Sequence, residues 1–351
     1  NVTNSEEEAK EYTNRYKLLY FCLIAVSVLV TARLFYLQIL QGEILRTYSD
    51  KNRVKETNIP APRGLILDRN MEVLVDNLPG FEAVIIPQQV ENLEESTKAV
   101  AKVLDLNPKQ LIKHVNTSKR QNGMFRPVKI KENLTLDEVM RVKMLRLNHP
   151  GVNINATILR SYTMDKNGAQ LFGYVGEISK RQIEDYNEKF KGEMTFVLGD
   201  IVGKNGLEEI WEKNIRGKDG ISFIEVDARG REKKEKSQAE SLLGFKPIDA
   251  KPGQNLVLTI DKDIQQAAYE AMQREDKIGP RIGALVAIKN NGEVLAWVNS
   301  PSYDPNEFST GISSSLWKEL IENPYKPLRN KVIQDHYAPG STFKPIVALA
   351  A

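Results

Sequence analysis

The apolar and polar positions of this chain change their pattern several times, and each pattern predicts a different element. From Leu18 to Leu40 almost every residue is apolar, which predicts a helix roughly 34 Å long, sufficient to cross a bilayer core. Arg33 interrupts the segment, but its side chain can reach the interface beside Tyr36. No small-residue cleavage site follows, so we predict an uncleaved anchor at 18–40 after a tail at 1–17. A buried core helix is the alternative.

The next pattern consists of short apolar runs parted by turn residues, which predicts strands. The runs lie at 65–67, 73–75 and 83–86. Helical periodicity then predicts helices, and a strand is expected after them near 152–160. The helices are expected at 91–104, 107–114 and 136–147. Gly203–Gly217 has the pattern of a turn, a helix and a glycine stop.

A linker at Pro247–Gly253 follows a solvated, charge-rich stretch at 229–236, and we place a domain boundary near 246. Beyond it, 255–261 is predicted as a strand, with Asp261 near the cap of a helix at 262–273. Gly283–Ser300 has the alternation of a hairpin around an Asn-Asn-Gly turn. The predicted architecture is therefore α+β and multidomain, with one domain at 41–245 and another at 246–351.

Composition removes several function classes. The formal net charge is only +3 and charged residues make up 27% of the chain, which argues against a nucleic-acid-binding protein. Cys22 is the one cysteine, so no disulfide can form within the chain. The three histidines are far apart, and we expect no metal site and no cofactor. Basic residues flank both ends of the apolar helix, so charge does not predict its orientation in a membrane.

Candidate chemistry lies near the end of the sequence, in the run Pro339–Pro345. Ser341 and Lys344 are three residues apart and would share one face of a helix, which would bring the lysine amine within reach of the serine hydroxyl. Gly340 permits a tight turn just before the serine. The residues after Lys344 are apolar on every side, which predicts a buried helix. Ser341 is thus a candidate nucleophile at a helix N-terminus and Lys344 its candidate base.

A second Ser-x-x-Lys match, Ser315 and Lys318, has a different context. Leu316, Trp317 and Leu320 are spaced as one helical face around it. This match is predicted to be part of a surface helix, without a catalytic role.

Four segments in this order resemble the class B penicillin-binding proteins, and within them the elongation type. The Ser-x-x-Lys spacing is itself a known mark of penicillin-binding proteins and β-lactamases. The segments are Pro62–Asn70 (Arg-Gly-x-x-x-Asp-Arg-Asn), Gly173–Gly176 with Gly203–Gly217, Ser300–Asn306, and Pro327–Lys331 leading into Tyr337–Ser341. The resemblance implies a membrane anchor, an elongated non-catalytic pedestal at 41–245, and the first part of a transpeptidase domain at 246–351, built of an antiparallel sheet with helices.

The sequence also departs from that family. Met71 stands in place of a glycine, Thr163 of a proline, Gln170 of a frequent histidine and Lys331 of a frequent arginine. The family's Ser-x-Asn and Lys-Thr/Ser-Gly motifs do not occur in these 351 residues. We therefore expect the transpeptidase domain to be truncated here, and the 351 residues alone to be inactive.

For the intact protein the resemblance implies a serine acyl-enzyme mechanism that crosslinks peptidoglycan stem peptides, inhibited by β-lactams. Ser341 would be the nucleophile, Lys344 the base, and the Ser341 N–H half of an oxyanion hole. The implied partners are a membrane glycosyltransferase of the SEDS family and a cell-shape scaffold protein, at the bacterial inner membrane with the catalytic domain in the periplasm. A division-type transpeptidase, a β-lactam sensor and a non-catalytic scaffold remain alternatives.

Overall fold

The computed structural model describes residues 3–42, 54–225, 246–276 and 279–350. The charge-rich stretch at 229–236 lies outside the described residues. The chain divides into two compact units, residues 1–57 with 221–247 and residues 58–220 with 248–351. The predicted boundary near 246 is not tested by this division and stays a prediction.

The first unit contains the long N-terminal helix. It runs as α1 (Thr3–Phe35) and ends in a π-helical turn, η1 (Tyr36–Leu40). Residues 19–40 are long and apolar enough to cross a membrane, by length and composition. The Arg33 guanidinium lies 5.4 Å from the centre of the Tyr36 ring, the pairing expected for an interfacial arginine. Strand β1 (Val54–Ile59) pairs with β8 (Gly220–Glu225).

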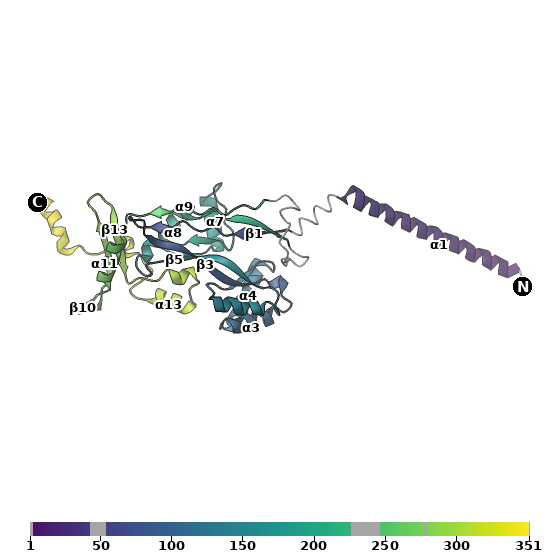
Figure 1. Ribbon diagram of the computed structural model, residues 1–351, viewed down its shortest axis with the longest axis horizontal. Coiled ribbons are helices and arrows are strands. Elements are labelled where there is room, and N and C mark those ends of the chain that lie inside the picture. The colour runs from purple at the N-terminus through teal and green to yellow at the C-terminus, as the bar shows by residue number, and fades with distance from the viewer. Residues whose placement is uncertain (1–2, 43–53, 226–245, 277–278, 351) are drawn as a thin grey trace. The chain divides into compact units, whose positions relative to one another are not determined.

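The second unit is organised around a five-stranded sheet in the order β4-β3-β2-β9, with β5 paired to β3. The two long strands β3 and β5 run side by side through the unit in Figure 1. The five strands are β2 (Ile66–Leu67), β3 (Val73–Ile85), β4 (Val128–Lys131), β5 (Val152–Tyr162) and β9 (Leu256–Val257).

The two runs predicted as separate strands at 73–75 and 83–86 form one strand, β3. Pro79 lies in its middle and pairs with Ile158 of β5. On the edge opposite β5, strand β3 pairs with β2 near one end and with β4 near the other. Pro79 lies between these two pairings, so its missing N–H removes no hydrogen bond between strands. The prediction of a break at Leu78–Gly80 is therefore wrong.

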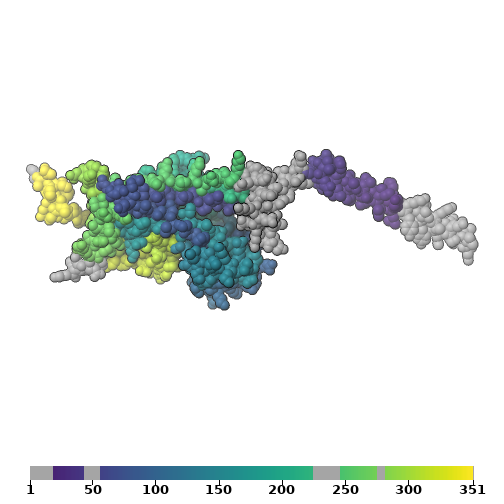
Figure 2. Space-filling model, viewed as in Figure 1, coloured from purple at the N-terminus to yellow at the C-terminus, as the bar shows by residue number. Residues whose placement is uncertain are grey.

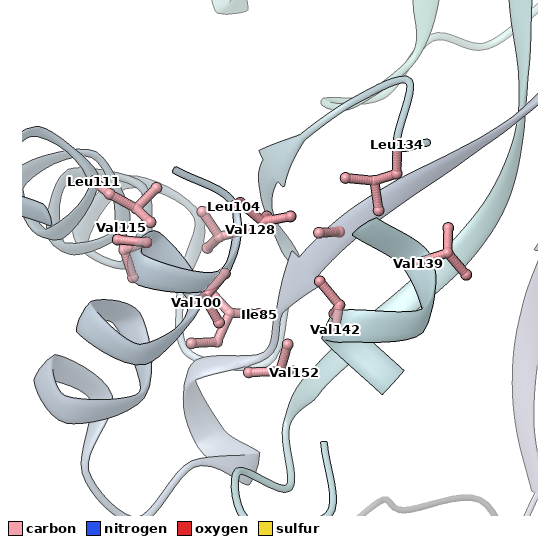
Figure 3. Close-up of a cluster of buried hydrophobic side chains, with 12 residues drawn as sticks. Ile85, Val100, Leu104, Leu111, Val115, Val128, Leu134, Val139, Val142 and Val152 are labelled. Atoms are coloured by element: carbon pink, nitrogen blue, oxygen red, sulfur yellow. The ribbon is translucent and has the colours of Figure 1, made fainter. Parts of the chain in front are cut away.

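Three helices cover one face of this sheet and enclose the largest apolar cluster (Figure 3). They are α3 (Leu93–Val103), α4 (Pro108–Asn122) and α5 (Leu136–Leu145), close to the predicted positions. Each begins at a side chain that accepts a backbone N–H, namely Asn92, Asn107 and Thr135. The cluster joins Ile85, Val100, Leu111, Val142 and Val152 with neighbours from the same elements.

A second cluster ties the sheet to the residues beyond 246. Ile66, Leu74 and Tyr162 pack there with Ile260. Asp261 caps α11 (Lys262–Gln273), as predicted. The hairpin of β12 (Gly283–Ile288) and β13 (Val294–Ser300) is also confirmed. The buried Gln265 amide fixes α11 to β13, since its Oε1 accepts from Trp297 N at 2.6 Å and its Nε2 donates to Trp297 O at 3.0 Å.

The remaining elements are short and surround these clusters. They are η2 (Pro87–Gln89), α6 (Ala169–Phe172), β6 (Val175–Glu177), α7 (Lys180–Lys189), β7 (Ile201–Gly203), α8 (Gly206–Ile210), α9 (Glu212–Ile215), β10 (Glu275–Asp276), β11 (Gly279–Pro280), α12 (Asn306–Ser309), α13 (Ser314–Glu322), α14 (Lys331–Gln334), η3 (Gly340–Phe343) and α15 (Lys344–Ala350). The one helix predicted within Gly203–Gly217 is thus divided into α8 and α9 at Trp211. The mixed α+β fold, its long apolar N-terminal helix and its antiparallel hairpins agree with the predicted class.

Candidate functional site

Four buried charged residues from distant segments meet in the second unit, and we call them the ionic cluster: Arg63, Arg160, Glu208 and Glu212. Arg63 Nη2 lies 2.7 Å from Glu208 Oε2 and 2.8 Å from Glu212 Oε2. Arg160 Nε lies 2.7 Å from the other Glu208 oxygen. The cluster therefore joins the segment before β2, strand β5 and the helices α8 and α9.

The ionic cluster is closed to solvent, because both glutamates are fully buried and the Arg160 side chain is 1% exposed. Burial opposes the charge on Arg63, but Glu208 and Glu212 together raise its pKa above the usual arginine value. At its rim Arg216 Nη2 lies 2.8 Å from Asp200 Oδ2. With this pair the cations and anions balance, which is the condition for burying so many charges.

Close backbone packing explains the glycine at the start of this segment. Gly203 N–H donates to Glu212 Oε2 at 2.9 Å. A Cβ at Gly203 would lie 2.1 Å from the Glu208 carbonyl oxygen, a clash with main chain that cannot move aside. The segment Gly203–Gly217 therefore works as a packing and ion-pairing element of the fold.

Another buried carboxylate, Asp68, links the segment before β3 to the start of α11. Its Oδ1 accepts the N–H groups of Asn70 and Glu72 at 2.7 and 2.8 Å, and its Oδ2 accepts from Lys262 N at 3.2 Å. Burial disfavours its charge, but these backbone donors lower the pKa of Asp68 below its usual value. Met71, which replaces the family's glycine, keeps a φ of 68° in the same turn.

Hydrogen bonds fix the segment Asn330–Val332, which precedes the predicted nucleophile, to neighbouring elements. Asn330 Nδ2 donates to Gln170 O at 3.2 Å, and Val332 N donates to Asn299 Oδ1 at 3.2 Å. Lys331 is buried between them, where its ammonium donates to two main-chain carbonyls, and burial lowers its pKa. These contacts fix α14 to the hairpin and to α6.

Beyond α14 the chain becomes exposed, and we call Pro339–Lys344 the nucleophile segment. Gly340 has a φ of 55°, a conformation that favours glycine, so the predicted turn is present. Ser341 lies in the 3-10 turn η3 and Lys344 begins α15. In such a turn residues i and i+3 are eclipsed, which places both on one side. No hydrogen bond joins their side chains in the described part of the chain.

The helix after Lys344 has the apolar pattern of a buried helix, but it is exposed in this structure. Every described residue from His336 to Ala350 is exposed, including Phe343, Ile346 and Leu349. Figure 2 shows this segment, in yellow at the C-terminal end, open to solvent on the visible face. No other element covers the apolar side chains of these described residues. An apolar pattern alone is therefore not sufficient to bury a helix.

The rival match behaves as predicted. Ser315 and Lys318 lie on α13, none of whose residues is buried. Ser315 Oγ lies 3.1 Å from Ser313 Oγ, and Lys318 Nζ lies 3.7 Å from Glu322 Oε1. This serine belongs to a surface helix.

Sequence reasoning singled out no member of the ionic cluster, although Arg63, Glu208 and Glu212 lie in segments that carry the family resemblance. Arg160 is the one arginine within a long strand otherwise made of apolar and uncharged residues, and a buried position for it required a facing carboxylate. Glu212 follows Glu208 at the i+4 spacing that puts both on one helical face. The sequence thus contains an unusual arginine and a pair of glutamates on one helical face, but neither feature shows which residue is its partner in the folded chain.

Comparisons with known proteins agree with the sequence motifs. The family described as the penicillin-binding protein dimerisation domain matches residues 58–258, and the penicillin-binding protein transpeptidase domain matches residues 282–351. The peptidoglycan D,D-transpeptidase MrdA of Acinetobacter baumannii is 31% identical over 345 residues, which cover 98% of this chain and 48% of that protein. MrdA of Escherichia coli is 30% identical over 344 residues, 98% of this chain and 52% of that protein.

A solved complex between penicillin-binding protein 2 and MreC from Helicobacter pylori contains a chain of similar fold, with a TM-score of 0.65 and 24% identity. The match covers 85% of this chain and 52% of that one. The chain thus spans about half the length of the curated relatives that it matches. Because the dimerisation-domain family alone matches more than half of its residues, this chain belongs to the penicillin-binding proteins, as its four sequence segments indicated.

Proposed function

We propose that the protein containing this chain is a peptidoglycan D,D-transpeptidase that crosslinks stem peptides during cell elongation. The observation that carries the proposal is the placement of Ser341 and Lys344. They lie three residues apart across a glycine-initiated turn, inside the range that matches the transpeptidase domain. The names of the MrdA relatives support the reaction and its elongation type.

In the proposed reaction Ser341 Oγ attacks the carbonyl carbon of the penultimate D-alanine of a stem peptide. The Ser341 proton passes to the Lys344 amine, and the terminal D-alanine leaves with a proton on its nitrogen. An amine of a neighbouring strand then attacks the ester, which forms the crosslink and frees Ser341. β-Lactams would acylate the same oxygen and block it. The Ser341 N–H would supply one donor to the oxyanion.

Penicillin labelling tests this assignment. In the protein at the full length of its relatives, a fluorescent penicillin should label Ser341, and Ser341→Ala should abolish the label. Ser315→Ala is the matched control and should label normally. Labelling that survives Ser341→Ala would overturn the proposal.

The role of Lys344 needs its own variant. Lys344→Arg keeps the positive charge but cannot release a proton, so we expect acylation to slow by about 100-fold or more. Near-normal acylation of this variant would show that Lys344 acts as a charge and not as a base.

We propose further that the chain is anchored at the inner membrane through residues 18–40, with residues 41–245 as a pedestal and the 246–351 part in the periplasm. A reporter fused after residue 60 that requires the periplasm should be active. Activity of a cytoplasmic reporter at that position would contradict this orientation.

Two protein partners are part of the proposal, a SEDS-family glycosyltransferase and a cell-shape scaffold protein. The similar fold solved in complex with MreC supports the second. The outer face of α5 suits a protein partner, since Leu136, Met140 and Met144 lie on it at 60% exposure or more. Met140→Glu with Met144→Glu should abolish capture of a purified scaffold protein, and Lys113→Glu on α4 should not. Unchanged capture would exclude this face.

A further inference from the structure

Strand β5 borders the five-stranded sheet. It pairs with β3 from Val152 to Tyr162 without a shift in register. Across the part of the chain that the structure describes, no strand pairs with its opposite edge. An edge of this length carries a row of main-chain donors and acceptors that need partners.

The direction of these groups follows from the ladder. Thr163 N donates to Leu74 O at 3.1 Å, so the odd-numbered residues of β5 bond toward β3. In a regular antiparallel pair alternate residues turn their N–H and C=O to opposite edges. The even-numbered residues Ala156, Ile158, Arg160 and Tyr162 therefore face away from β3.

The chain itself confirms this direction at one end. Tyr162 N donates to Asn306 Oδ1 at 2.8 Å, and Asn306 Nδ2 donates to Tyr162 O at 3.0 Å. Ser309 Oγ donates to Arg160 O at 3.1 Å. The amide of Asn306 thus bonds to Tyr162 as the main chain of an added strand would, and the helix α12 that carries it covers only this end of the edge.

Further along, the edge is open. The outward N–H and C=O groups of Ala156 and Ile158 have no hydrogen-bond partner among the described residues. They border a cavity of about 490 Å³ that is lined by all six residues from Asn155 to Arg160. Neighbouring strand residues point to opposite faces, so six in a row line one cavity only when it lies along the strand's free edge.

The charges of the lining indicate what the cavity accepts. It contains four cationic side chains (Arg63, Lys129, Arg160, Arg216) and five anionic ones (Glu82, Glu132, Glu177, Asp200, Asp219). This near balance disfavours a polyanion and favours a ligand with both donors and acceptors.

We propose that the free edge of β5 at Ala156–Ile158 binds an extended peptide segment of a partner protein as an added strand within this cavity. Main-chain pairing of this kind supplies affinity, and the side chains along the cavity supply specificity. The site uses neither Ser341 nor Lys344. It therefore stands independently of the proposed reaction.

The test uses the full chain in lipid nanodiscs and a phage-displayed library of random heptapeptides. We expect the selection to yield peptides that bind the wild type. These peptides should bind the Ala156→Pro variant about tenfold or more weakly, because proline removes one outward N–H. Since that N–H makes no bond to β3 and edge strands accept proline, the ladder should remain. Ala156→Ser changes the same exposed side chain but keeps the N–H, and should bind as the wild type does.

Hydrogen exchange on the unsubstituted chain gives a second, independent result. Binding of a selected peptide should slow exchange of the Ala156 and Ile158 amides. The proposal is overturned if no peptide is selected, if selected peptides bind Ala156→Pro and Ala156→Ser alike, or if these two amides are unaffected by binding. Protection of the same amides by a saccharide, with no peptide able to compete, would also overturn it.

Discussion

The ionic cluster and the nucleophile segment lie in the same unit and are built in opposite ways. The cluster draws its charges from three distant segments, buries their side chains and holds Glu208 between two guanidinium groups. The nucleophile segment is continuous in sequence, exposed along its length, and has no hydrogen bond between its serine and lysine within the described residues. One is fixed by tertiary contacts and the other by a local turn.

This difference separates folding from chemistry in the chain. The cluster joins the segment before β2, strand β5 and the helices α8 and α9, and its charges balance locally. The nucleophile segment carries the proposed nucleophile Ser341 and the proposed base Lys344 on an exposed turn. Substitutions in the two regions should therefore report on different properties, stability in the first and acylation in the second.

The largest effect is expected for Glu208→Gln. Glu208 pairs with both Arg63 and Arg160, so removing its charge leaves Arg160 buried without a counter-ion and Arg63 with Glu212 alone. We expect the free energy of unfolding of the full chain in detergent to fall by about 3–5 kcal/mol, measured by chemical denaturation.

Glu209→Gln is the matched control, because this neighbouring carboxylate lies outside the cluster and is half-buried. Its effect should stay within about 0.5 kcal/mol. Equal losses in the two variants would show that the cluster does not organise the fold.

A smaller, pH-dependent effect is expected for Asp68→Asn. The variant loses the charge that three backbone N–H groups stabilise, at a cost of about 1–3 kcal/mol at neutral pH. The folded-state pKa of Asp68 is lowered, so this stabilisation is present above the unfolded pKa and is lost as pH falls through the folded value.

Unfolding curves of both proteins from pH 7 down to pH 2 measure this directly. The gap between wild type and variant should be constant near neutrality and should close below about pH 4. A gap that persists unchanged at pH 2 would show that the carboxylate charge is not its source.

The smallest effect on stability is expected for Ser341→Ala. Its hydroxyl is exposed and makes no described contact with Lys344, so unfolding should change by less than about 0.5 kcal/mol. A larger decrease in the free energy of unfolding would show that Ser341 is packed against other residues. The nucleophile segment would then not differ from the ionic cluster in this respect.

Much of the fold could be read from local patterns. Asp261 was predicted near the start of a helix that the structure contains, because capping is a contact between near neighbours. The strand break at Leu78–Gly80 was wrongly predicted, since a proline is harmless where its edge of the ladder is unpaired. That condition depends on β2 and β4 and cannot be read from β3 alone.

The candidate site shows the same limit. Ser341 and Lys344 could be proposed because their spacing carries the chemistry, and Gly340 because its turn is local. The pairing of Arg160 with Glu208 could not, since it joins residues of a strand and a helix through the fold. The apolar pattern of the helix after Lys344 gives a preference for burial, but it does not identify the elements that would cover the helix.

Amide hydrogen exchange of the full chain in detergent tests the contrast between the two regions most directly. The account predicts that amides of 203–215 and of β3 exchange only through global unfolding, while those of 341–350 exchange orders of magnitude faster through local opening. Equal protection of 341–350 and the ionic cluster would contradict it, because the nucleophile segment would then be held by the same cooperative structure.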